Sequence, residues 1–60
     1  MSKNADVILR QCLTMGMPVR LSERDGQFIC IVEKAWITIT ADTLDDAIIE
    51  ACTKALTNES

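Results

Sequence analysis

An Asp-Gly dipeptide at positions 25 and 26 constrains the fold of this chain more than any other sequence feature. It separates two segments, 17–23 and 27–33. If each segment forms a strand, its successive residues point to opposite faces of a sheet. A two-residue type I′ turn needs positive φ at both central positions, which Asp and Gly tolerate well. The sequence therefore predicts two strands joined as a β-hairpin of defined register. The predicted pairs are Arg24–Gln27, Leu21–Cys30 and Val19–Val32.

A third strand is predicted at 36–40, where Trp-Ile-Thr-Ile-Thr alternates aromatic and β-branched residues. The more apolar face of the hairpin is the predicted core face; it carries Met17, Val19, Leu21, Phe28, Cys30 and Val32. We expect Ile37 and Ile39 to join it, because the opposite register would bury two threonine hydroxyls instead. The outer face then carries Arg20, Ser22, Ile29, Ile31, Trp36, Thr38 and Thr40.

Two helices flank the predicted sheet. Apolar residues recur at helical spacing within 5–15, namely Ala5, Ile8, Leu9, Cys12 and Leu13. Asn4 is the expected N-cap and Gly16 the expected stop signal. A second helix is predicted at 43–57, capped by Asp42 or Thr43. Its apolar stripe consists of Leu44, Ala47, Ile48, Ala51, Cys52 and Ala55, and residues 58–60 form a polar tail. The prediction is a single α+β domain, 1–60, with both helices on the core face of a three-stranded antiparallel meander.

Composition argues against several functions. The chain contains no histidine, so neither a Ser-His nor a Cys-His pair can form within it, and we expect no enzymatic activity, metal or cofactor. The net charge of −3 argues against nucleic-acid binding. Three cysteines at wide spacing are expected in the core of a protein from a reducing compartment. Without an apolar run of membrane-spanning length or a secretory-type start, the expected location is the cytoplasm.

An interaction surface is predicted on the outer face. Ile29, Ile31 and Trp36 place large apolar groups where polar ones are expected, and Arg20 and Thr38 lie beside them. Because a chain of this size gains from additional burial, the sequence favours a homodimer joined through that face. Two other interpretations remain: Trp36 caps the edge of the core, or Arg20, Arg24 and Lys34 hold an anion such as a nucleotide.

Residues 37–56, ITITADTLDDAIIEACTKAL, resemble the closing segment of the phage ABA sandwich domain, and more weakly HicB-type antitoxins. The resemblance implies a phage or prophage accessory protein that binds a host or phage protein, or an antitoxin-like partner of a toxin. Neither family supplies catalytic residues. The predicted element order is also that of the double-stranded RNA-binding domain. Asp42, Asp45 and Asp46 would repel RNA phosphates at the start of the second helix, so we expect no RNA binding.

Overall fold

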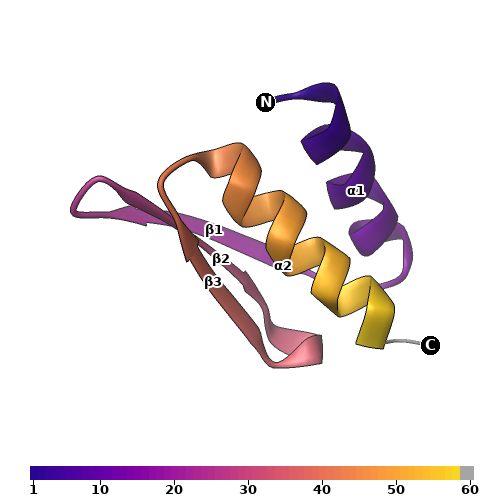
Figure 1. The fold of residues 1–60 in the computed structure, drawn as a ribbon. Coiled ribbons are helices and arrows are strands. Elements are labelled where there is room, and N and C mark those ends of the chain that lie inside the picture. Colours follow the sequence, from indigo (N-terminus) through magenta and orange to yellow (C-terminus); the bar gives the residue numbers. More distant parts are fainter. Residues whose placement is uncertain (59–60) are drawn as a thin grey trace.

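A computed structural model describes residues 1–58, and it confirms the predicted α+β order (Figure 1). The elements are α1 (Lys3–Thr14), β1 (Val19–Arg24), β2 (Gln27–Val32), a 3₁₀ turn η1 (Glu33–Ala35), β3 (Ile37–Ala41) and α2 (Leu44–Asn58). Helix α2 includes Asn58, which the sequence assigned to the tail. The rest of that tail, residues 59–60, lies outside the described residues.

The three strands form an antiparallel sheet in the order β1-β2-β3. Asp25 has φ of 55° and Gly26 has φ of 81°, as a type I′ turn requires. The turn sets the register of the hairpin, and all three predicted pairs are present. The Asp25-Gly26 prediction is therefore confirmed at both the local and the sheet level.

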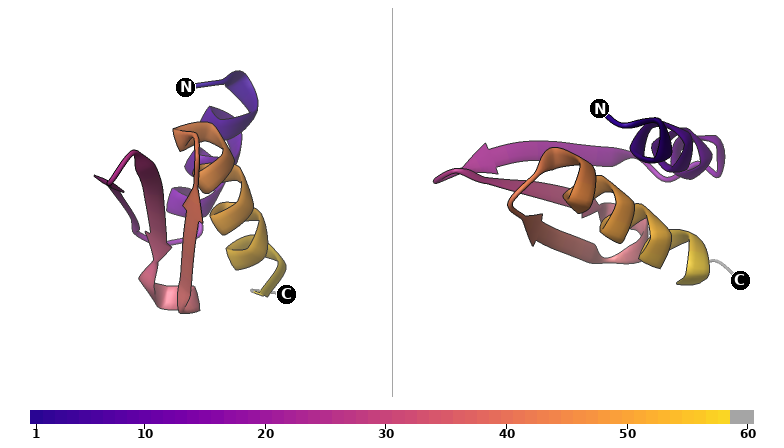
Figure 2. Two further views of the ribbon diagram at one scale, coloured as in Figure 1. Left: turned by 60° about the vertical axis from the view of Figure 1, so that its left-hand side comes forward. Right: turned by 45° about the horizontal axis from the view of Figure 1, so that its top comes forward.

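Both helices lie on one face of the sheet, as predicted (Figure 2). Helix α2 packs against β2 and β3, while α1 packs beside α2, near the end of β1 where the strand begins. The tip of the β1–β2 hairpin projects away from α1 (Figure 1). Only part of the inner sheet face is therefore covered.

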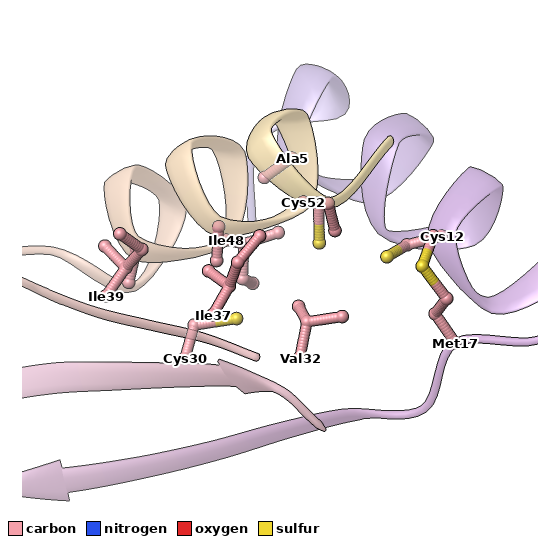
Figure 3. Packing of buried hydrophobic residues seen from close by; sticks show 12 residues of the cluster. Ala5, Cys12, Met17, Cys30, Val32, Ile37, Ile39, Ile48 and Cys52 are labelled. Atoms are coloured by element: carbon pink, nitrogen blue, oxygen red, sulfur yellow. The ribbon is translucent and has the colours of Figure 1, made fainter. Parts of the chain in front are cut away.

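The core lies between the helices and this inner face (Figure 3). Its fully buried members include five residues of the α2 stripe: Ala47, Ile48, Ala51, Cys52 and Ala55. Ile37 and Ile39 are buried, which confirms the preferred register of the third strand. Two expected core residues are exposed, Leu21 by 42% and Leu13 by 50%. Five others are only half-buried against the core: Ile8, Leu9, Val19, Phe28 and Leu44. Leu21 is exposed because α1 covers only the beginning of β1; Leu13 lies too far around α1 from Ala5 and Cys12.

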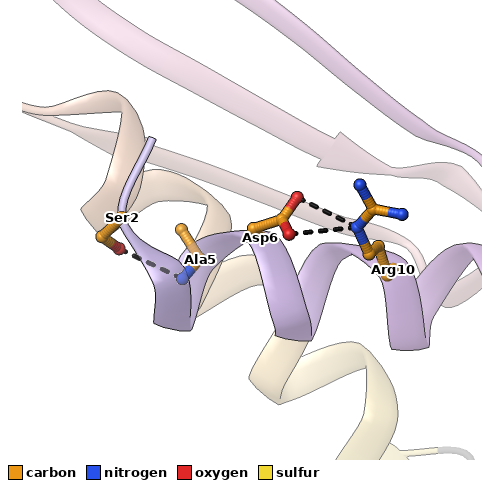
Figure 4. A network of polar contacts seen from close by, with 4 residues as sticks. All are labelled: Ser2, Ala5, Asp6 and Arg10. Carbon is orange, nitrogen blue, oxygen red and sulfur yellow. Dashed lines mark hydrogen bonds and ion pairs between the residues drawn. The ribbon is translucent and has the colours of Figure 1, made fainter.

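At the two ends of α1, the predicted N-cap is wrong and the predicted stop signal is confirmed. The N-cap is Ser2, not Asn4: the Ser2 Oγ accepts a hydrogen bond of 3.1 Å from the Ala5 N–H (Figure 4). Helix α1 therefore begins two residues earlier than predicted. At the other end Gly16 has φ of 82°, and its N–H donates to the Leu13 carbonyl. The Met17 N–H donates to the Cys12 carbonyl at 3.2 Å, which completes a Schellman motif.

Polar contacts also anchor the helix starts. Between the two predicted caps of α2 the structure favours Thr43, whose Oγ1 accepts from the Asp46 N–H at 3.1 Å. The Asp45 carboxylate accepts from the Ser2 N–H at 2.9 Å, so the beginnings of the two helices are linked. Within residues 1–58, neither helix combines the length and the apolar character that crossing a membrane requires.

Candidate functional site

The outer sheet face, defined here as Arg20, Ser22, Ile29, Ile31, Thr38 and Thr40, lies opposite the helices. The register arranges these residues in two rows across the strands. Ile31 is paired with Arg20 on one side and Thr38 on the other. In the neighbouring row, Ile29 is flanked by Ser22 and Thr40. Both isoleucines are half-buried by their neighbours, and the flanking polar residues are exposed.

Trp36 borders the first row and is 94% exposed. It is not the first residue of a strand, as the alternation suggested; it follows η1 in the left-handed conformation, with φ of 58°. Its N–H donates to the Glu33 carbonyl at 3.0 Å, which closes the turn before β3 begins. The alternative in which Trp36 caps the edge of the core is therefore wrong.

Trp36 also lines a shallow hollow of about 430 Å³ together with Ile31, Glu33, Ile37 and Thr38. Beside the hollow, Nη1 of Arg20 lies 2.6 Å from Oε1 of Glu33, so the guanidinium is already engaged by a carboxylate. Of the predicted interface residues, the structure thus gathers Trp36, Ile31, Thr38 and Arg20 at one end of the sheet. Ile29 lies in the next row.

The three cations of the alternative anion site do not converge. Arg20 is paired with Glu33. Arg24 lies at the hairpin tip, whereas Lys34 lies in η1, with its Nζ directed toward Gly16. The length of β2 separates Arg24 from Lys34, and six residues of strand span about 20 Å.

The three thiols do converge, although their sequence spacing gave no indication of it. Cys12 from α1, Cys30 from β2 and Cys52 from α2 are all free and buried in the core (Figure 3). Burial raises the pKa of Cys52 to about 12, and the neighbouring Cys12 and Cys30 add to the rise. Burial, with Cys12 nearby, also raises the pKa of Cys30. The thiols of Cys30 and Cys52 therefore stay protonated at neutral pH, and all three cysteines pack as core residues. Among the described residues, no group of His, Cys, Asp and Glu side chains is arranged to hold a metal ion.

Two further hollows were not foreseen. The larger, about 790 Å³, lies between α2 and the end of the sheet where β2 begins and β3 ends. Its charged lining is Asp42, Asp46, Glu50 and Lys54. The other, about 590 Å³, is mostly apolar and lies between α1 and the end of α2. Its lining includes Val7 and Met15, which are about half exposed and fall outside the apolar stripe used to predict α1.

Comparison of the chain with models of protein families, with curated proteins and with solved structures finds no match.

Proposed function

We propose that this chain is a non-enzymatic interaction module of phage or prophage type that binds protein through its outer sheet face, with a second copy of itself as the occupant. The observation that supports the proposal is the exposure of Trp36. Its side chain is 94% exposed, and its backbone has a positive φ of 58°, which is unfavourable for a bulky residue. A bulky residue at positive φ costs roughly 1–2 kcal/mol, and within this chain the indole recovers almost none of that by burial. An interface would supply the missing burial.

The surroundings of Trp36 support a protein partner. The indole stands next to Ile31, with Thr38 and the Arg20–Glu33 ion pair at the periphery. Tryptophan and arginine are the commonest anchors of binding hot spots, which combine an apolar centre with a polar rim. A standard interface of about 800 Å² per partner would cover about a fifth of the 4038 Å² surface of this small chain.

The nucleotide-binding alternative has less support. It needs several cations directed at one anion, whereas Arg20 is engaged by Glu33, and Arg24 and Lys34 lie at opposite ends of β2. An antitoxin-like role would use the same outer face with a different protein on it. Pull-down from the native host with the wild-type chain and Trp36→Ala as baits separates that role from self-association.

The decisive experiment measures molar mass by light scattering up to high micromolar concentration. Wild type should exceed the monomer mass, and its indole emission should shift to the blue as concentration rises. Trp36→Ala should dissociate markedly more readily, whereas the control Val7→Ala, a truncation of a 46% exposed residue on α1, should match wild type. A wild-type chain that stays monomeric with a water-exposed indole, and a pull-down in which Trp36→Ala retains every protein that wild type captures, would together exclude the proposal.

A further inference from the structure

A second surface suited to self-association lies along the free edge of β1. The strand forms one side of the sheet, and every residue after Val19 is exposed. On the inner face, Leu21 is 42% exposed although its cross-strand partner Cys30 is buried. The opposite edge strand, β3, differs because its inner-face residues Ile37 and Ile39 are already buried under α2. Of the two edge strands, β1 is therefore the one with exposed apolar surface on the inner face of the sheet.

The turn determines which backbone N–H and C=O groups of β1 point toward β2 and which point toward the open edge. Arg24 and Gln27 are the first and last residues of a two-residue turn, so they form a hydrogen-bonded pair. Alternation then directs the amide and carbonyl groups of Val19, Leu21 and Glu23 away from β2, toward the open edge. Pro18 has the opposite parity, so its missing N–H leaves no gap at that edge.

Helix α1 presents a flank toward the same side. Gln11 lines the hollow shared with Leu56 of α2, so this side of α1 faces α2. Leu9 and Leu13 are each two residues from Gln11, which places them about 200° around the helix, on the opposite flank. Leu13 is 50% exposed there. An exposed leucine of α1 and an exposed leucine of β1 thus border the same uncovered region.

We infer that a second copy of this chain pairs antiparallel with β1 and so forms a six-stranded sheet, about a two-fold axis that is normal to the sheet and passes between the two copies of Leu21. Leu21 then faces Leu21 of the partner subunit, and Val19 faces Glu23 of the partner subunit, so all three outward-directed residues of each strand form hydrogen-bonded pairs. Because the strands run in opposite directions, the hairpin tip of each copy reaches α1 of the other.

The charges of β1 select this register. With the axis at Leu21, Arg20 lies opposite Ser22 of the partner subunit. An axis at Arg20 places that arginine opposite its own copy, and an axis at Ser22 places Arg20 opposite Arg24 of the partner subunit. Like charges directly opposite each other are destabilising. The Leu21-centred register avoids this repulsion and also forms the most backbone hydrogen bonds.

This contact is independent of the outer-face contact proposed above. An axis normal to the sheet leaves the outer faces of both copies on the same side, uncovered. A chain that uses both contacts assembles beyond the dimer, and a chain that uses the edge alone forms a dimer that does not need Trp36. The test is therefore made in a Trp36→Ala background, which keeps failure of one proposal distinct from failure of the other.

The test uses the pairing of residue 21 with the same residue of the partner subunit. In the Trp36→Ala background, Leu21→Lys and Leu21→Glu each bring two like charges together, so each should raise the dimer dissociation constant by about tenfold or more. Mixing the two variants should restore a dimer that native mass spectrometry identifies as one copy of each. As a control, Thr53→Lys and Thr53→Glu on the exposed surface of α2 should leave the association of the Trp36→Ala chain unchanged. Retention of the dimer by both single variants, or no heterodimer on mixing, overturns the inference.

Hydrogen exchange of the backbone amides, measured on the chain that carries only Trp36→Ala, provides a second test. It does not depend on whether the Leu21→Lys and Leu21→Glu variants fold. The amides of Val19, Leu21 and Glu23 should exchange more slowly as concentration rises, while those of Arg20 and Ser22, directed at β2, should be protected at every concentration. Fast exchange of the first group at all concentrations, or a chain that stays monomeric up to high micromolar concentration, overturns the inference.

Discussion

Replacing Trp36 by glycine should stabilise the isolated chain, although it removes the largest side chain of the sequence. The residue has φ of 58°, a conformation that costs an L-residue roughly 1–2 kcal/mol and costs glycine little. The indole is 94% exposed, so deleting it forfeits very little buried apolar area. The hydrogen bond from the backbone N–H of residue 36 to the Glu33 carbonyl remains in the variant.

The expected magnitude is the relieved backbone strain minus the larger chain entropy that glycine loses on folding, which is roughly 0.5–1 kcal/mol. The net gain for Trp36→Gly therefore lies between about 0 and 1.5 kcal/mol; its central value of about 0.75 kcal/mol corresponds to roughly 3–6 °C in melting temperature for a domain of this size. Trp36→Ala is the matched comparison, because it removes the same indole but keeps a Cβ at positive φ. Its stability should stay close to that of wild type.

Urea denaturation followed by far-ultraviolet circular dichroism measures all three chains without relying on the indole. The measurement is made at low micromolar concentration, where association contributes least. If Trp36→Gly and Trp36→Ala lose stability equally, the indole stabilises the monomer through contacts. That result would refute a role for the exposed indole in binding.

Three further outcomes follow from the described contacts. Ser2→Ala should cost about 0.5–2 kcal/mol in urea unfolding, because it removes the α1 cap, whereas Asn4→Ala should be nearly neutral; equal losses would contradict the assignment of the cap. Ile48→Ala should cost about 2–5 kcal/mol, since Ile48 is fully buried, and a loss below 1 kcal/mol would contradict the described packing. Stability should also depend on alkaline pH. Folding raises the pKa of Cys52 from 9.0 to about 12, so the unfolded chain loses this proton first and stability falls as pH rises above 9. Urea midpoints between pH 7 and 11 should decline less in Cys52→Ala, and an identical decline would exclude this thiol as the cause.

Local chemistry accounts for most of the secondary structure and register. Asp25-Gly26 specified the hairpin and its pairs, because few other dipeptides accept positive φ twice. Gly16 specified the end of α1 for the same stereochemical reason. The spacing of small apolar residues in 44–55 identified the buried stripe of α2, since helical periodicity is a property of the segment itself.

Other features depend on where separate segments meet. Alternation suggested that Leu21 is buried, but its exposure depends on how far α1 extends along β1, which no short segment encodes. Trp36 followed a strand-like pattern, yet the 3₁₀ turn before it forces a left-handed backbone and turns its side chain to solvent. The three cysteines meet because two helices and a strand pack around one core, whereas Arg24 and Lys34 are kept apart by the length of β2. Periodicity and turn stereochemistry act over a few residues, while exposure and convergence arise only when distant elements pack together.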